Sequence, residues 1–239
     1  MKKLLAALLF ILPTLAFAID FEGYYITAKG GASKTFNTGR TSFNDKDGNL
    51  IAFPNEDLDT GSAFGFSVGK YVTDSFRLEL EAIKRTGYEY DVNSLLFPAS
   101  ANKAKIETHA LFINGFYDFQ PVTMSNTAII PYLGVGVGIS RNKMGTIVRH
   151  NNGIPNLVTI DDNTINQFAY KLSAGTLVSL TEQLSLDVNY QYVNLGASKG
   201  GTKRRDEGVR SPDIDLQRGI DGGEIKTQEL MVGLQYTFK

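Results

Sequence analysis

The 239-residue chain contains neither cysteine nor tryptophan. Without cysteine it can form no disulfide bond, no thiolate metal site and no lipid anchor on an N-terminal cysteine. An excess of one charge is also missing, because 24 Lys and Arg residues stand against 25 Asp and Glu residues. Proteins that bind nucleic acids normally carry a basic surplus, and we therefore expect no nucleic-acid partner.

Long hydrophobic runs are scarce, and the clearest one lies at the N-terminus. Residues 1–18 begin with two lysines, continue through an apolar stretch and end in Ala16-Phe17-Ala18. This order is typical of a cleaved secretory signal peptide, and the run is shorter than the ~20 residues of a transmembrane helix. We expect residues 1–18 to be that signal peptide and residues 19–239 to form one exported domain. Because no apolar run of helix-spanning length follows, only a closed β-barrel could cross a membrane.

Apolar and polar residues alternate with a period of two in eight segments of the exported domain. The segment near residues 76–82 is the clearest, since Arg77, Glu79 and Glu81 each stand between apolar neighbours. Such alternation predicts strands with one apolar and one polar face. In the fourth segment we assign Phe112 and Phe116 to the polar face. The eight segments lie near residues 24–33, 63–71, 76–82, 104–119, 131–140, 167–179, 184–192 and 227–238.

The connections between these segments alternate strictly between long and short. Residues 35–62, 91–103, 141–166 and 195–223 are long connections, whereas 71–76, 119–129 and 179–184 are short. A soluble barrel would not require this asymmetry, but outer-membrane barrels have short periplasmic turns and long outside loops. The sequence therefore predicts an all-β fold: an eight-stranded antiparallel up-and-down transmembrane β-barrel with four long extracellular loops and short periplasmic turns.

No residue on the eight apolar faces is charged, as expected for a surface that contacts lipid. The membrane-facing candidates are Leu78, Leu80, Leu133, Val135, Leu172, Leu186, Val188, Val232 and Leu234. Aromatic residues gather where the segments meet the short connections. We expect an interfacial girdle of Phe76, Tyr117, Phe119, Tyr236 and Phe238.

The opposite faces predict a polar lumen. Its candidate network is Lys29, Arg77, Glu79, Glu81, Lys171, Asp187 and Glu229. Eight strands enclose a space that side chains can fill, and so we favour a plug of paired charges over an ion path. Gly134, Gly136 and Gly138 lack the spacing of a nucleotide-binding loop, and we expect them to relieve crowding on the inner wall.

An enzymatic interpretation would make His150 a general base assisted by Asp161 or Asp162. No nucleophile can be paired with this histidine by spacing, and we expect no catalytic residue. Residues 45–49 suggest a calcium loop, but their glycine stands at the fourth position instead of the sixth. We therefore expect neither a metal nor a cofactor.

Turn residues inside two long connections indicate hairpins that extend the barrel wall. One would pair residues 41–43 with 50–53, and the other would pair residues 146–148 with 157–160. In the last long connection, basic and acidic residues are interspersed, which predicts a flexible solvated loop. Lys203, Arg204 and Arg205 are its candidates for contact with a ligand.

Several motifs resemble the OmpA-like and opacity-protein-like eight-stranded barrels, including surface antigens of intracellular bacteria. They are PYLGVGVG at 131–138, FAY at 168–170, LSLDVNYQY at 184–192 and VGLQYTF at 232–238. The resemblance implies a non-enzymatic outer-membrane surface protein whose loops serve adhesion, host interaction or antigenic display. A narrow small-solute porin is the alternative, and a loop-histidine lipid hydrolase is less favoured. Outer-membrane lipid, an unknown extracellular ligand and the barrel-assembly machinery are its implied partners, the last through a C-terminal strand that departs from the family in ending on Lys239 after Phe238.

Overall fold

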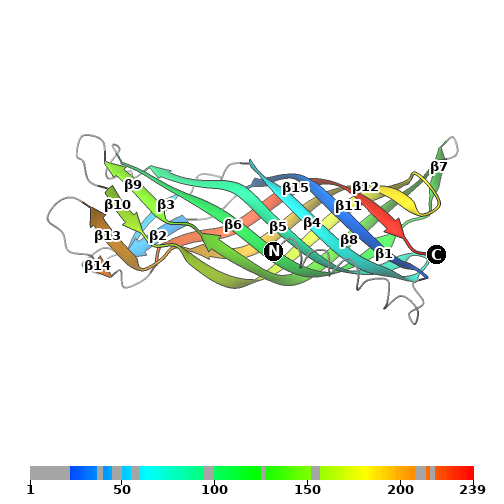
Figure 1. The fold of residues 1–239 in the computed structure, drawn as a ribbon, viewed down its shortest axis with the longest axis horizontal. Helices are drawn as coiled ribbons and strands as arrows, with labels where there is room; N and C mark the ends of the chain where they lie inside the picture. Colours follow the sequence, from blue (N-terminus) through cyan, green and yellow to red (C-terminus); the bar gives the residue numbers. More distant parts are fainter. Residues whose placement is uncertain are drawn as a thin grey trace, which may run out of the picture.

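The computed structural model describes residues 22–36, 40–44, 50–54, 60–93, 100–124, 127–151, 157–207, 214–215 and 219–239. Every regular element in these residues is a β-strand, and all the strands belong to one sheet. Eight long strands form an elongated barrel wall (Figure 1). They are β1 (Tyr24–Thr35), β4 (Thr60–Thr73), β5 (Phe76–Asn93), β6 (Ser100–Asp118), β8 (Thr127–Met144), β11 (Asn163–Ser179), β12 (Leu184–Lys199) and β15 (Asp221–Thr237).

The first and last wall strands close the barrel. β1 pairs with β15 from Tyr25↔Thr237 to Thr35↔Thr227, and each wall strand pairs antiparallel with the next wall strand along the chain. Closure leaves no free edge in the wall, which suits a surrounding solvent that cannot satisfy backbone hydrogen bonds. The predicted eight-stranded antiparallel barrel is confirmed. Among the described residues there is no helix long and apolar enough to cross a membrane.

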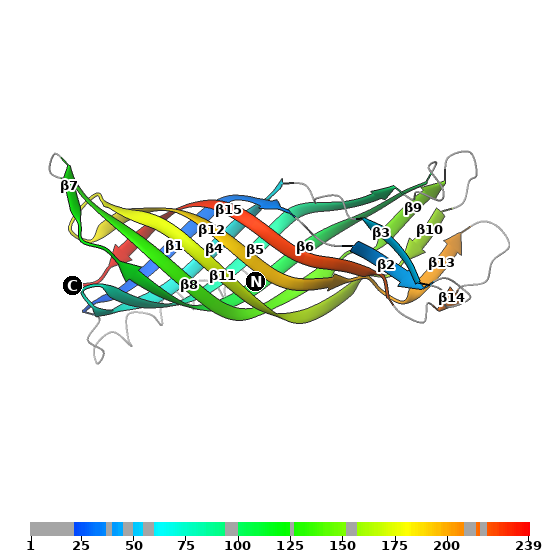
Figure 2. The same cartoon turned by 180° about the vertical axis from the view of Figure 1, so that it is seen from behind.

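The two ends of the barrel differ (Figure 2). At the end that holds the C-terminus, β4 reaches β5 and β11 reaches β12 through short turns. The third connection at this end, residues 119–129, is more than a turn, because β7 (Val122–Met124) pairs with the first residues of β8. All other short strands lie at the opposite end.

Both predicted loop hairpins are present. β2 (Arg40–Asn44) pairs with β3 (Leu50–Pro54), and β9 (Ile147–Asn151) pairs with β10 (Leu157–Ile160). The second hairpin extends the wall, because β9 also pairs with the outer end of β6. The residues of both hairpin tips, including the calcium-loop candidate 45–49, lie outside the described residues.

In two of the predicted long loops, residues that we expected to be irregular form strands. β5 continues to Asn93 and β6 begins at Ser100, so most of residues 91–103 is strand. In the last connection, β13 (Lys203–Glu207) pairs with β10, and β14 (Ile214–Asp215) pairs with β13. The expectation of a flexible loop was therefore wrong for β13, because hydrogen bonds to β10 hold its basic and acidic residues in a sheet.

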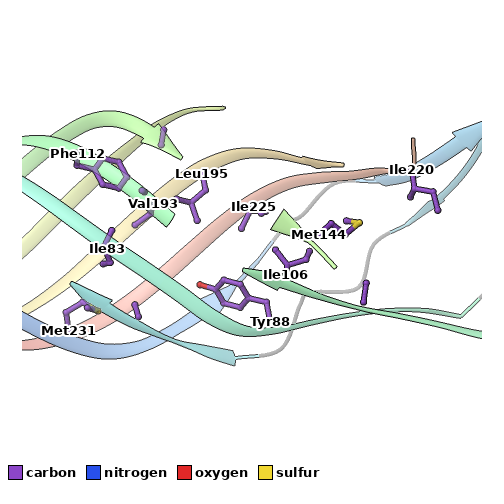
Figure 3. Packing of buried hydrophobic residues seen from close by; sticks show 14 of the residues in the cluster. Ile83, Tyr88, Ile106, Phe112, Met144, Val193, Leu195, Ile220, Ile225 and Met231 are labelled. Atoms are coloured by element: carbon purple, nitrogen blue, oxygen red, sulfur yellow. The ribbon is translucent and has the colours of Figure 1, made fainter. Parts of the chain in front are cut away.

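The alternation predicted a polar lumen, but the lumen is polar only in part. Toward the loop end, apolar side chains from several strands pack inside the barrel (Figure 3). Tyr88, Ile106, Met144, Leu195 and Ile225 belong to this inner apolar cluster, and each is nearly or completely buried. The barrel core thus has a charged part and an apolar part, and the apolar part stabilises it by excluding water.

Candidate functional site: the lumen and the outer rim

The outward face of the wall is apolar over the middle of the barrel. Seven of the nine membrane-facing candidates are exposed, from 45% for Leu78 to 61% for Val135, whereas Leu186 and Val188 are half-buried. In the fourth segment Leu111 and Ile113 point outward, and Phe112 and Phe116 are buried inside. Within the described residues these outward side chains stay exposed, and this arrangement is compatible with contact to lipid.

The aromatic candidates for the girdle lie at the short-turn end. Phe76 pairs with Tyr117 across β5 and β6. Tyr117 and Phe119 stack edge to face with ring centroids 5.2 Å apart, and Tyr236 and Phe238 do the same at 5.2 Å. Aromatic rings at this place are typical of the girdles that outer-membrane barrels form at the lipid headgroups.

All seven lumen candidates are buried, and a central group of four forms one network. Lys29 Nζ lies 2.8 Å from Glu81 Oε1 and 3.8 Å from Glu79 Oε1. Lys171 forms a second ion pair with Glu81. Asn114 donates to both carboxylates at 3.0 Å. Two lysines therefore neutralise two glutamates in a space from which water is largely excluded, as buried charges require.

Arg77 occupies the lumen nearer the short turns. Its Nε lies 2.8 Å from Asp118 Oδ2, and its Nη1 donates to Gln235 at 3.2 Å. The guanidinium carbon also lies 4.7 Å from the ring centroid of Phe116 and 4.9 Å from that of Tyr132. Asp187, another of the lumen candidates, accepts a hydrogen bond of 2.6 Å from the Tyr132 hydroxyl. Aromatic rings and one carboxylate thus enclose the guanidinium.

Glu229 belongs to a third group that includes residues absent from our sequence candidates. Arg85 binds its carboxylate through two nitrogens, and both residues are completely buried. Ser33, Thr227 and Gln191 donate further hydrogen bonds to the same carboxylate. The available signal was the continued alternation along β5, which carries every second residue from Arg77 to Arg85 to the inside.

The inner-wall glycines make room for these groups. A Cβ atom on Gly136 would lie 2.2 Å from Asn114 Oδ1 and 3.0 Å from Lys171 Cγ. A Cβ atom on Gly134 would lie 2.4 Å from the Phe116 ring. Such distances are shorter than van der Waals contact, so these positions exclude any side chain as long as their neighbours stay in place.

The residues proposed for a loop enzyme are not brought together. His150 pairs with Leu157 toward the hairpin tip, whereas Asp161 follows the opposite end of β10. At ~3.3 Å per residue, the four residues from Leu157 to Asp161 separate the two sites by about 13 Å. Both aspartates form ion pairs elsewhere: Asp161 Oδ1 lies 3.8 Å from Arg205 Nε, and Asp162 Oδ2 lies 3.2 Å from Lys143 Nζ. In the part of the chain that the structure describes, no group of three or more His, Cys, Asp or Glu residues could hold a metal ion.

The three basic loop candidates lie on β13, outside the barrel. Lys203 and Arg205 are exposed, and Arg204 is partly covered. Arg204 and Arg205 pair with Ile160 and Thr159 of β10. At the opposite end, Lys239 Nζ donates to Glu182 Oε2 at 2.6 Å in the turn between β11 and β12. This hydrogen bond lowers the pKa of the Glu182 carboxyl group below its ordinary value.

Two known proteins are similar to this chain in sequence. The chain is 29% identical to the outer membrane protein PagN of Salmonella typhimurium over 189 residues, which cover 73% of this chain and 75% of PagN. It is 23% identical to a putative adhesin of Rickettsia bellii, covering 92% of this chain and 98% of that protein.

Two solved structures have the same fold. Neisserial surface protein A has a TM-score of 0.51 and 16% identity, covering 91% of this chain and 98% of that one. OprG of Pseudomonas aeruginosa has a TM-score of 0.54 and 17% identity, covering 91% of this chain and 96% of that one. The family model described as "Outer membrane protein beta-barrel domain" matches residues 4–238. The chain therefore belongs to the family of outer-membrane β-barrel proteins and resides in the bacterial outer membrane.

Proposed function

We propose that this protein is a non-enzymatic surface protein whose barrel supports a sheet extension that binds a ligand outside the cell. The carrying observation is the set of strands β9, β10 and β13, which continues the pairing of β6 beyond the barrel wall. The similarity to a Rickettsia bellii protein named a putative adhesin supports this function. The loop-enzyme interpretation gains no support, because His150 lies toward the tip of the hairpin whereas Asp161 and Asp162 follow the other end of β10 and pair with Arg205 and Lys143.

The chemistry of the extension favours an anionic ligand. Lys203 and Arg205 are exposed on β13, and Arg205 reaches its acidic neighbour Asp161 only at 3.8 Å. A half-exposed pair at this distance contributes little stability, so the guanidinium is available to a carboxylate, sulfate or phosphate of a partner. The hydrogen-bonded strand holds these cations in place and thereby reduces the entropy that binding would cost.

The experiment is adhesion of cells that display the protein. Met144 pairs with Asn163 at the base of the hairpin, so residues 145–162 can be replaced by a two-residue Asn-Gly turn without changing the wall register. We expect this variant to assemble, as measured by heat-modifiable gel migration, and to lose adhesion to host cells. Replacement of residues 36–59, which contain β2 and β3, is the matched control. Undiminished adhesion without residues 145–162 would contradict the proposal.

The proposal also includes the export of the chain through a cleaved signal peptide and its assembly into the outer membrane. We expect residues 1–18 to be removed on export, which mass spectrometry of the protein from outer membranes would detect as an N-terminus at Ile19. We also expect the assembly machinery to recognise β15 through its C-terminal aromatic residue, Phe238. A Phe238→Ala variant should then accumulate unassembled in the periplasm, whereas Gln235→Ala, an inward-facing change on the same strand, should leave recognition intact.

The porin alternative requires an open path through the lumen. The paired lysines and glutamates, Arg77 with its surrounding rings and the inner apolar cluster together support a closed plug. We expect no reproducible single-channel steps from the purified protein in planar bilayers. Steps that weaken in a Lys171→Met or Glu79→Gln variant would support the porin instead.

A further inference from the structure

A row of basic side chains crosses the outer surface directly beyond the apolar belt. The strand register aligns Lys84 of β5 with His109 of β6, and His109 with Arg141 of β8. All three side chains are exposed. The next outward row toward the short turns is entirely apolar, since Ala82, Leu111, Ile139 and Phe168 are paired in the same order. The row of Lys84, His109 and Arg141 therefore marks the border between a basic and an apolar part of the outer surface.

The position of this row along the barrel axis matches the level expected for the headgroups of the outer leaflet. With ~3.3 Å per residue and a strand tilt of about 40°, Lys84 lies about 20 Å along the barrel axis from Phe76 of the girdle. The tilt staggers neighbouring residues of the row by about 3 Å each, which keeps the three groups within about 6 Å of one height. An outer-membrane barrel has an apolar band about 25 Å tall, so the row stands at its outer border.

The same surface contains a hollow that begins at the row. It has a volume of about 370 Å³ and is lined by Phe64, Gly65, Phe66, Ala82, Ile83, Lys84, His109 and Ala110. Phe64 and Phe66 are 60% and 52% exposed, whereas the alanine beside Phe66 in the register is small. The hollow is therefore apolar with two nitrogen-bearing side chains at one rim, a form that fits an acyl chain below an anionic headgroup.

The nitrogen-bearing side chains of the row are available to such a headgroup. The side chains of His109 and Arg141 make no hydrogen bond or ion pair with another described residue. Among the described residues Lys84 forms one ion pair, with Glu107, whose Oε2 lies 3.7 Å from the Lys84 Nζ, and both side chains are about half exposed. A loose exposed pair of this kind contributes at most about 1 kcal/mol, and phosphate oxygens can compete with it.

We propose that Lys84, His109 and Arg141, together with the hollow over Ala82, bind one phosphorylated lipid of the outer leaflet. The acyl chain lies against Phe64 and Phe66, and Lys84 and Arg141 pair with phosphate oxygens. Arg141 can engage two oxygens at once, and Lys84 extends its amine toward the headgroup along an apolar stem. This lipid would be held closer to the short turns than the extension strands are, because β9 pairs with β6 only from Ser100 to Lys103, beyond His109.

Native mass spectrometry of the full exported protein in detergent tests the site, with diphosphoryl lipid A as the probe. Each Lys or Arg near an anionic surface contributes about 1 kcal/mol, which corresponds to a factor of about five in affinity. We expect the double variant Lys84→Gln/Arg141→Gln to bind lipid A about 25-fold more weakly. Ala82→Leu, which fills the hollow without changing charge, should also weaken binding.

The matched control is Lys70→Gln. Lys70 is exposed on β4 at the girdle end, where its Nζ lies 4.4 Å from the Tyr24 ring centroid. This variant removes one outward charge far from the proposed site and should bind lipid A as the unaltered protein does. Enzymatically dephosphorylated lipid A should bind weakly, and inorganic phosphate should not displace the intact lipid.

Three results would overturn the proposal: undiminished binding by the double variant, an equal loss in Lys70→Gln, or displacement of the lipid by inorganic phosphate. All variants are first checked for heat-modifiable migration. If the double variant does not fold, the single variants Lys84→Gln and Arg141→Gln give the same comparison at about five-fold each.

Discussion

Arg85 of β5 and Glu229 of β15, whose strands are separated in the wall by β4 and β1, form a completely buried two-point ion pair. Arg85 Nε lies 2.5 Å from Glu229 Oε1, and Nη2 lies 3.1 Å from Oε2. β5 and β15 are not neighbours in the wall, so the pair crosses the interior instead of following a hydrogen-bonded row. The contact therefore connects two parts of the cylinder and fills the space between the central charges and the inner apolar cluster.

Removal of one partner of this pair should be costly. Arg85→Met leaves a buried carboxylate without its cation, and we expect a loss of about 3–5 kcal/mol in the free energy of unfolding. Urea titration in detergent, followed by circular dichroism because the chain has no tryptophan, measures this loss. Adding Glu229→Gln should recover part of the stability.

The exposed pair of Lys143 and Asp162 is the control for Arg85. Its Nζ–Oδ2 distance is 3.2 Å, but both side chains are about half exposed. Lys143→Met should therefore change the unfolding free energy by at most about 1 kcal/mol. If the losses from Arg85→Met and Glu229→Gln simply add in the double variant, the two side chains are not coupled and the assignment is wrong.

Gly136 should not tolerate even one methyl group. The added Cβ would meet Asn114 Oδ1 at 2.2 Å, and Asn114 holds both Glu79 and Glu81. We expect Gly136→Ala to destabilise the barrel by about 1–3 kcal/mol through overpacking. Gly65→Ala is the matched control, because its nearest neighbours would lie at 3.4 Å. Similar unfolding midpoints for the two variants would show that the lumen is looser than these distances imply.

The inner apolar cluster should contribute more to stability than the outward apolar face. Ile106 is 1% exposed inside the barrel, and its truncation to Ala should cost about 2–5 kcal/mol because a cavity remains. Leu111 on the same strand is 44% exposed on the outside. Lipid or detergent can fill the space left by Leu111→Ala, so we expect a smaller loss there. Equal losses would contradict a packed inner cluster.

The sequence could predict which residues face inward, but not which of them meet. Strict alternation in residues 76–82 was sufficient to assign Arg77, Glu79 and Glu81 to one face. Contacts such as Lys171 with Glu81 depend on strand register and tilt, which alternation in single strands does not determine.

Irregularities in the strands hid other parts of the site. The register of β5 and β6 shifts between Arg85 and Tyr88, where Gly87 has a φ of +92°. The register of β12 shifts after Asn194, where Gly196 has a φ of +73°. These bulges place Tyr88 and Ser198 inside at positions that a simple period of two does not identify. The outward cationic row was missed for a related reason, because Lys84, His109 and Arg141 come together only through the register of three strands.

A cation on the outward face should be tolerated according to its depth in the membrane. Val232 is 48% exposed on β15, about 10 Å along the barrel axis from Tyr236 of the girdle at ~3.3 Å per residue and a tilt of about 40°. This places it near the middle of the apolar band, and Val232→Arg should cost about 2–4 kcal/mol. Gln228 is also exposed on β15 but lies about 20 Å from Tyr236, near the outer border, where an arginine should cost at most about 1 kcal/mol. Reversible unfolding in lipid vesicles measures both changes, and a cost for Gln228→Arg that equals or exceeds that for Val232→Arg would contradict the position of the barrel in the bilayer.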